Sequence, residues 1–267
     1  MLADQPAAQT PVPAAVRELA GGRALRVVWE NQMGGLTFEV GTGNDRRFVK
    51  WTPAASGIDL DAEMRRLKWA ARFVEVPRVL DHGSDNSGSW FVSAALLGEN
   101  AVTAYWKADP QRAVTAIGHG LRTLHDTLPR ESCPFSWSLA ARLSQAERRA
   151  ANGLLDPRTW HAEHMNLSVK EALAALREPP APAEDLVVCH GDACAPNTLL
   201  DRDGNATGHV DVGTLGVADR WADLAIATWS TTWNYGHGWE TRLLDAYGIE
   251  TDPTKTAYYR LLWDLGP

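Results

Sequence analysis

The chain has 267 residues, with 26 Lys and Arg against 33 Asp and Glu, so its formal net charge is −7. This acidic balance argues against nucleic acid as a partner, because phosphate backbones are bound by basic surfaces. The 45% hydrophobic and 22% charged residues are typical of a globular protein.

No apolar run approaches the roughly 20 residues that a membrane helix needs, so we expect no membrane partner. The chain has three cysteines, Cys133, Cys189 and Cys194. An odd and sparse set argues against a disulfide framework and for a reducing compartment, so we expect a cytoplasmic protein.

The first part of the chain is predicted to be rich in strands. Residues 1–15 (MLADQPAAQTPVPAA) lack the basic and apolar regions of a secretion signal, and we expect them to form a frayed arm. Short β-type runs follow, separated by turn segments such as NQMGG and GTGND. The expected strands are 25–30, 36–40, 46–51, 76–83 and 89–96, with one helix at 59–73.

After Leu97 the apolar spacing becomes helical. Helices are predicted over 111–128, 138–155, 169–180, 221–233, 238–248 and 254–265, with short strands within 185–192, 198–201 and 206–213. This order predicts an α+β protein with two lobes. Residues 1–97 would form an antiparallel sheet with one helix, and residues 98–267 a mostly helical lobe with the catalytic and acceptor-binding groups. A ligand site is expected between the lobes.

The stretch VVCHGDACAPNTLL, residues 187–200, carries the chemistry. Phosphoryl transfer needs a carboxylate beside the acceptor hydroxyl and oxygen ligands for Mg²⁺. Asp192 is the predicted base, and Asn197 and Asp211 are the predicted metal ligands. The bland alternative is that Asp192 caps a turn and Asn197 bonds to its own loop.

Complementary groups occur in the first lobe. Lys50 ends the apolar run FVKW, where an unpaired lysine is costly, and Glu63 lies on the following predicted helix. The pair would hold nucleotide phosphates, unless both side chains simply face solvent. Gly34 and Gly35 in NQMGG would let the backbone approach the phosphates, although the same segment is also an ordinary hairpin turn.

Two histidines of the second lobe have structural interpretations. His190 is expected to brace the loop around Asp192, and His125 to be a buried structural residue. A zinc site built from Cys189, His190, Cys194 and His209 is disfavoured, because the spacing matches no common zinc pattern.

Over residues 25–267 the chain resembles the aminoglycoside 3′-phosphotransferases, small kinases with a protein-kinase-like fold. The similarity is densest from DLVVCHGDACAPNTLL through GHVDVGTLGVADRWADLAIAT and extends to YYRLLWDL. The resemblance implies ATP and Mg²⁺ as cofactors, a bilobal fold and a role in antibiotic resistance. It implies the following residues: Asp192 as catalytic base, Asn197 and Asp211 at the metal, Lys50 and Glu63 at the phosphates, Ala94 and Ala95 at the adenine, and Asp223 as a brace of the catalytic loop.

The acceptor-binding segments depart from the family. The family holds polycationic acceptors with acidic side chains, but the loop PRTWHAEH has Arg158 and His161, with Glu163 as the nearest carboxylate. After the next helix, Trp233 and Asn234 stand where acids are expected. A buried ammonium without a counter-charge is costly, so these changes should weaken aminoglycoside binding.

Other side chains could offset this loss. Asp264 near the C-terminus would replace one of the family's acids by position, and Glu240 and Asp245 are further candidates. Four aromatic residues could instead stack on a sugar or another flat, less charged molecule: Trp229, Trp233, Tyr235 and Trp239. Trp229 and Trp233 are four residues apart on a helix, so they could equally pack in the core.

The sequence therefore predicts an ATP-dependent O-phosphotransferase that acts on a hydroxyl, the 3′-hydroxyl by resemblance, of an aminoglycoside-type antibiotic. One alternative is the same chemistry on another hydroxylated small molecule or sugar. A second alternative is a non-catalytic nucleotide- or drug-binding pseudokinase. The expected partner is a small-molecule hydroxyl acceptor, and the expected state is a monomer or weak dimer.

Overall fold

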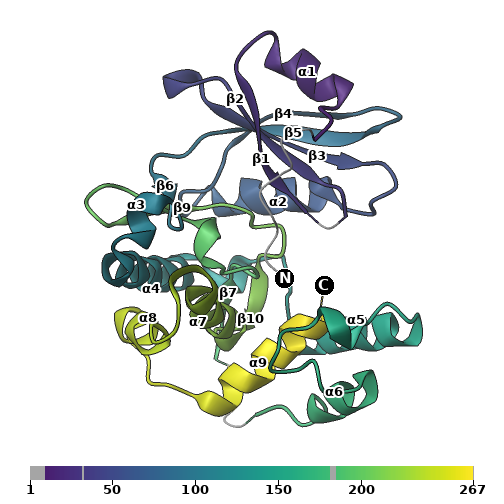
Figure 1. Cartoon of the computed structure of the whole chain (residues 1–267), viewed down its shortest axis with the longest axis vertical. Coiled ribbons are helices and arrows are strands. Elements are labelled where there is room, and N and C mark those ends of the chain that lie inside the picture. Colours follow the sequence, from purple (N-terminus) through teal and green to yellow (C-terminus); the bar gives the residue numbers. More distant parts are fainter. Residues whose placement is uncertain (1–9, 32, 181–184, 267) are drawn as a thin grey trace. The chain divides into compact units, whose positions relative to one another are not determined.

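The computed structural model describes residues 10–31, 33–180 and 185–266. The chain divides into two compact units, the first spanning residues 2–96 and the second residues 97–267. Figure 1 labels the helices and strands along the sequence.

The first unit contains a five-stranded antiparallel sheet in the order β1-β2-β3-β5-β4. Its strands are β1 (Leu25–Glu30), β2 (Leu36–Val40), β3 (Arg47–Pro53), β4 (Val79–Ser84) and β5 (Gly88–Ala94). Side chains alternate between the faces of a strand. In β3, Val49 and Trp51 therefore join the apolar core on one face, while Lys50 points to the other.

One helix covers each face of this sheet. Helix α2 (Leu60–Ala70) lies on the Lys50 face, since Glu63 of α2 bonds to that lysine. Helix α1 (Ala14–Ala20) lies on the opposite face, where Val16 and Ala20 pack with Phe38 of β2. The expected arm thus contains the start of a helix that sequence reasoning missed, and residues 1–9 of that arm lie outside the described residues.

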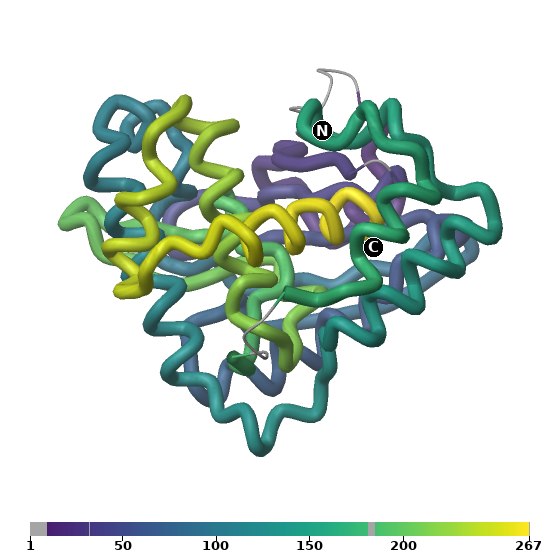
Figure 2. Tube along the Cα trace, turned by 90° about the horizontal axis from the view of Figure 1, so that it is seen from below, coloured from purple at the N-terminus to yellow at the C-terminus, as the bar shows by residue number. Residues whose placement is uncertain are grey.

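The second unit is mainly helical. Its helices are α3 (Ala104–Lys107), α4 (Pro110–Thr127), α5 (Leu139–Ala151), α6 (Val169–Ala175), α7 (Trp221–Tyr235), α8 (Glu240–Tyr247) and α9 (Pro253–Leu265). Helix α7 is buried from Trp221 to Thr231 and is the core helix of the unit. Helix α9, yellow in Figure 2, packs against α7 and α5, while α8 packs against α4 and α7.

The second unit also contains two small antiparallel sheets. In one, β7 (Leu186–Cys189) pairs with β10 (Gly216–Asp219). In the other, β8 (Thr198–Leu200) lies between β6 (Glu99–Asn100) and β9 (Ala206–His209). These elements confirm the expected α+β class, and within the described ranges no helix is both long and apolar enough to cross a bilayer.

Candidate active site

The loop that follows β7 is held by a close backbone contact. Gly191 has φ +89°, and a Cβ at this position would lie 2.5 Å from Thr214 Oγ1 and 2.6 Å from the Thr214 carbonyl oxygen. Only glycine combines this conformation with so close a neighbour. The loop therefore turns sharply at Gly191, and Asp192 follows this turn just after the buried strand β7.

A buried carboxylate from α7 anchors the same turn. Asp223 accepts the backbone N–H groups of His190 at 2.5 Å and Gly191 at 2.9 Å. Burial alone would raise the pKa of Asp223. The hydrogen bond from His125 outweighs burial, together with electrostatic attraction to His125 and His190 and the bond from the Gly191 N–H. The pKa of Asp223 is therefore lower than that of an ordinary carboxyl. Asp223 thus stays ionised and fixes the start of the loop, as the resemblance implied.

A chain of hydrogen bonds supports this carboxylate from behind. His125 Nε2 lies 2.9 Å from Asp223 Oδ2, and its Nδ1 lies 2.8 Å from the hydroxyl of Tyr247. Arg220 Nη1 donates to that hydroxyl at 2.7 Å. These three hydrogen bonds are compatible with donation in one direction, from Arg220 through Tyr247 and His125 to Asp223. The chain joins α4, α8 and α7 to the loop.

His190 braces the loop from the other side. Its Nε2 donates to the carbonyl oxygen of Val210 at 2.9 Å, and its Nδ1 accepts the Asp192 N–H at 3.2 Å. With both ring nitrogens engaged, the imidazole links the Asp192 loop to the segment that leads to Asp211. This matches the bracing role that the sequence favoured.

Asp192, Asn197 and Asp211 form an oxygen-rich group. The Oδ1 atom of Asp192 is buried and has no hydrogen-bond partner among the described residues. Burial, and then the neighbouring Asp211 carboxylate, raise the pKa of Asp192. The Asn197 amide nitrogen donates to the Asp192 carbonyl at 2.9 Å, which leaves its amide oxygen available.

Asp211 has an unusual backbone. Its φ is +60°, and no other non-glycine residue in the described ranges has a positive φ. Such conformations cost free energy and are typical of functional sites. The Asp211 carboxylate and the Asn197 amide oxygen suit a hard divalent cation such as Mg²⁺, and the orphaned oxygen of Asp192 lies beside them.

A second group of metal-type ligands is structural. His125, Cys189 and Asp223 have ligand atoms within 4.8 Å of one another. However, His125 and Asp223 are bonded to each other, and burial raises the pKa of the Cys189 thiol well above its ordinary value. A protonated thiol is a poor metal ligand, so this triad is part of the loop anchor.

The predicted nucleotide residues lie in the first unit. Lys50 Nζ on β3 is 2.7 Å from Glu63 Oε2 on α2, and Glu63 is 6% exposed. Glu63 lies on the buried face of the helix with Leu60 and Leu67. The ion pair therefore fixes the lysine against the sheet, whereas Lys68 of the same helix is exposed.

The glycine turn is closed internally. The side-chain oxygen of Asn31 accepts the Gly35 N–H at 2.8 Å, and its carbonyl accepts the Gly34 N–H at 3.0 Å. Phosphate binding by these two amides would require these bonds to be exchanged.

The segment after β5 is only partly available for an adenine. The Ala94 N–H donates to the Arg78 carbonyl at 2.9 Å, so this N–H is already engaged. Ala94 and Ala95 also line a cavity of about 300 Å³ within the first unit, together with Val74, Val76 and others.

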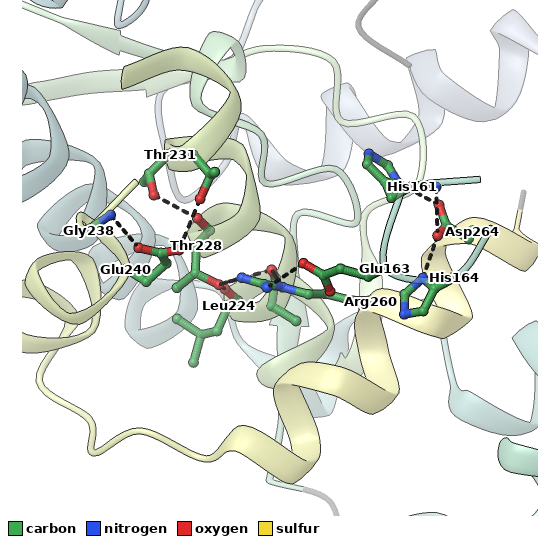
Figure 3. Close-up of polar contacts among 12 residues, drawn as sticks. His161, Glu163, His164, Leu224, Thr228, Thr231, Gly238, Glu240, Arg260 and Asp264 are labelled. Atoms are coloured by element: carbon green, nitrogen blue, oxygen red, sulfur yellow. Dashed lines mark hydrogen bonds and ion pairs between the residues drawn. The ribbon is translucent and has the colours of Figure 1, made fainter. Parts of the chain in front are cut away.

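The residues predicted to bind the acceptor fall into two groups. Arg158 is highly exposed and is paired with its neighbour Asp156 at 2.7 Å, so nothing draws it into the site. His161 instead contacts Asp264, and Glu163 pairs with Arg260 of α9, as Figure 3 shows. The Asn234 amide donates to the Ser230 carbonyl at 2.8 Å on the same helix.

Sequence reasoning missed several residues of these networks. Tyr247 and Arg220 complete the chain to Asp223, while His164 and Arg260 bind Asp264 and Glu163. The spacing of His161 and His164 in HAEH was the one visible signal. The others come from helices distant in sequence and carry no motif.

Comparisons with known proteins agree with this site. Residues 29–260 match the model of the family described as "Phosphotransferase enzyme family". The chain is 38% identical to an aminoglycoside 3′-phosphotransferase of Streptomyces fradiae over 218 residues, which are 79% of this chain and 81% of the relative. It is 34% identical to a streptomycin 3″-kinase of Streptomyces griseus over 225 residues, covering 80% and 82% of the two chains.

Solved structures show the same similarity. A crystal structure of an aminoglycoside 3′-phosphotransferase of type VIII superposes with a TM-score of 0.80 and 35% identity, covering 94% of this chain and 97% of that one. An aminoglycoside phosphotransferase of Streptomyces rimosus, in complex with ADP and streptomycin, has a TM-score of 0.75 and 29% identity, covering 94% and 95%.

Proposed function

Because this chain belongs to the phosphotransferase enzyme family, in its aminoglycoside 3′-phosphotransferase branch, we propose that it phosphorylates an aminoglycoside-type antibiotic. The γ-phosphoryl group of ATP would be transferred to a hydroxyl, the 3′-hydroxyl, of this acceptor. Such a modification would give the host resistance. The names of the relatives, and the ADP and streptomycin bound to one of them, support this proposal.

The observation that carries the proposal is the partnerless Oδ1 of Asp192. A buried carboxylate oxygen without a donor is costly, and an acceptor hydroxyl would satisfy it. Asp192 would orient this hydroxyl and take its proton as the oxygen attacks the γ-phosphorus. Its raised pKa makes it a stronger base than an ordinary carboxylate.

Asn197 and Asp211 would hold Mg²⁺ through their side-chain oxygens. The ion, when bound, would neutralise charge on the donor phosphates. The residues of this chain supply the geometry: His190 and Asp223 fix the loop, and the Asn197 amide is oriented by the Asp192 carbonyl.

The nucleotide would be held by residues of the first unit. Lys50 would bind donor phosphates while Glu63 fixes its ammonium group, and the Ala94–Ala95 backbone would meet the adenine. Gly34 and Gly35 would approach the phosphates once their internal bonds are exchanged.

A coupled ADP-release assay tests the proposal. With Mg-ATP we expect turnover of kanamycin and none of tobramycin, which lacks the 3′-hydroxyl. Asp192→Ala should lower kcat by about 10²–10⁴-fold, since a positioned base contributes this much. Unchanged turnover in this variant would exclude Asp192 as the base, and turnover of tobramycin would place the modified hydroxyl elsewhere.

A further inference from the structure

The carboxylate of Asp264 is already fully engaged. His161 Nδ1 lies 2.6 Å from its Oδ1, and His164 Nδ1 lies 2.6 Å from its Oδ2, which also accepts the His161 N–H at 3.2 Å. The Asp264 side chain is only 4% exposed. The hydrogen bonds from the two imidazoles, and their charge when protonated, hold its pKa below the ordinary value, although burial opposes this. The acid expected to bind the acceptor therefore faces two imidazoles.

The other carboxylates of this region also have partners within the chain. Glu163 pairs with Arg260 at 3.6 Å, and Glu240 accepts from Thr232 at 3.0 Å and from the Gly238 N–H at 3.1 Å. Figure 3 shows these pairs beside the Asp264 cluster. Asp156 is taken by Arg158. In the loop 152–168, the segment 236–240 and α9, each carboxylate thus has an internal partner.

Flat rings occupy the space between these carboxylates. The imidazole of His161 stacks on Trp233 with centroids 4.8 Å apart and planes at 11°, and lies 3.9 Å from Trp229. Arg260 covers Trp229 at 5.2 Å from the ring centroid. We call His161, Trp229 and Trp233 the ring wall.

The exposed part of the ring wall offers one polar atom. Since Nδ1 of His161 faces Asp264, Nε2 is the remaining polar atom, and within the described ranges it has no hydrogen-bond partner. The His161 side chain is 19% exposed, and Trp233 is half-buried. A ligand can therefore reach the imidazole edge and the indole face.

The ring wall adjoins the catalytic loop. Ser230, next to Trp229 on α7, accepts the Ala195 N–H at 2.9 Å, three residues after Asp192. All of these residues belong to the second unit. When the reacting hydroxyl of an acceptor reaches Asp192, another part of the same acceptor would thus lie near the ring wall.

From this geometry we infer that the ring wall selects acceptors that present an uncharged, hydroxylated sugar ring to it, and disfavours an ammonium there. The inference rests on the proposed function and narrows its substrate class. A desolvated ammonium needs a carboxylate in contact, whereas a hydroxyl needs only one good hydrogen bond. His161 is then a specificity-determining residue, and Asp264 positions its ring.

Matched acceptors test this inference. Paromomycin and neomycin differ by a hydroxyl or an amino group at the 6′ carbon, and kanamycin A and kanamycin B differ in the same way at the 2′ carbon. Calorimetry on the full chain without nucleotide would give Kd for all four. We expect the hydroxyl compound to bind roughly three- to tenfold more tightly in at least one pair, as one hydrogen bond allows.

Three variants locate the effect. Trp233→Glu places a carboxylate on the ring wall and should reverse the preference, while Trp239→Glu makes the same change outside the wall and should leave it unchanged. His161→Phe keeps a flat ring but removes Nε2, and should abolish the hydroxyl preference. In kinetics the preference should appear in KM for the acceptor, with KM for ATP unaltered.

The outcomes separate this inference from the proposed function. Tighter binding of the amino compound in both pairs, equal binding in both, or no binding of any compound would overturn the inference. So would an unchanged ratio in His161→Phe. Turnover of any of the four compounds supports the proposed function whatever the ratio. If the hydroxyl compounds bind more tightly but none of the four compounds is turned over, the inference about the ring wall is supported. Kinase activity on these acceptors is then excluded.

Discussion

Asp192 illustrates how a functional residue opposes the stability of its own fold. Its carboxylate is desolvated, lies near Asp211 and has one oxygen without a partner. The raised pKa means that the folded chain holds this proton more tightly than the unfolded chain. The bound proton stabilises the folded chain in acid, where Asp192 is protonated. This stabilisation is lost as pH rises through the pKa that Asp192 has in the folded chain.

Asp192→Asn should therefore stabilise the metal-free and nucleotide-free protein at neutral pH. The substitution removes the buried charge, and each kcal/mol relieved should raise Tm by about 2–4 °C. The gain should shrink as pH falls toward the raised pKa of Asp192, because the wild-type carboxyl then becomes increasingly protonated. Thermal melts at a series of pH values from neutral downwards check it, with the exposed Asp203→Asn as control. A Tm of Asp192→Asn below wild type at about pH 8 would contradict the account.

Asp211 shows a different residue-scale cost. Its positive φ places a non-glycine residue in a left-handed conformation beside another carboxylate. Neither feature stabilises the fold. Both are understandable if Asp211 holds a cation beside the proposed base Asp192, so local strain here points to the same function as the motif spacing.

At the scale of elements, the catalytic loop depends on helices that carry no catalytic residue. Tyr247 ends α8, His125 lies in the last turn of α4 and Arg220 precedes α7. Their hydrogen bonds converge on Asp223 and pass through it to the His190 and Gly191 amides. A substitution at Tyr247 should thus alter the position of the loop that carries Asp192.

Tyr247→Phe should lower both stability and turnover. The loss of one buried hydroxyl leaves His125 Nδ1 without its donor and costs about 1–3 kcal/mol. A displaced loop should lower kcat about tenfold or more, since small misplacements are costly to catalysis. Urea unfolding and steady-state kinetics measure the two effects. Tyr258→Phe removes a hydroxyl bonded to Leu176 instead, and should affect stability without the loss of kcat. Equal kcat in both variants would show that the chain does not position the loop.

Element boundaries were predictable where local signals were strong. The expected strands 25–30 and 36–40 coincide with β1 and β2, and Pro110 and Pro253 begin α4 and α9 as N-terminal prolines do. Helix α1 was missed because Pro- and Ala-rich sequence reads as a coil. Its formation depends on burying Val16 and Ala20 against the sheet, which is a tertiary effect.

At the scale of the whole molecule, the proposed roles divide between the two compact units. Lys50 and Glu63 belong to residues 2–96, while Asp192, Asp211 and the ring wall belong to residues 97–267. Each group is held by contacts within its own unit. Donor and acceptor binding should therefore respond to separate sets of substitutions.

Lys50→Ala should weaken ATP binding and spare the acceptor. The loss of one charged contact to the phosphates should raise the Kd for ATP by about tenfold or more. Calorimetry with ATP and with kanamycin would separate the two sites. Lys68→Ala on the exposed face of α2 is the matched control and should change neither Kd. A larger effect on kanamycin than on ATP would contradict the division of roles.

The sequence by itself determined the fold class and the phosphotransferase motif. The periodicity of strands and helices is a local feature of the sequence. Asp192, Asn197 and Asp211 also lie within one short stretch, so their spacing can be read directly. Lys50 and Glu63 were also foreseeable, because a lysine in an apolar strand needs a partner and the next helix offered one acid.

Only the tertiary structure decided what the acceptor meets. From sequence, four acids were candidates to bind ammonium groups: Glu163, Glu240, Asp245 and Asp264. Asp245 is exposed on α8. The fold pairs Glu163 with Arg260, Glu240 with Thr232 and Gly238, and Asp264 with two imidazoles. Their availability depends on neighbours up to about a hundred residues away in the chain, as His161 and Asp264 show with a separation of 103. Spacing along the sequence cannot report whether a charge has already been neutralised by such a neighbour.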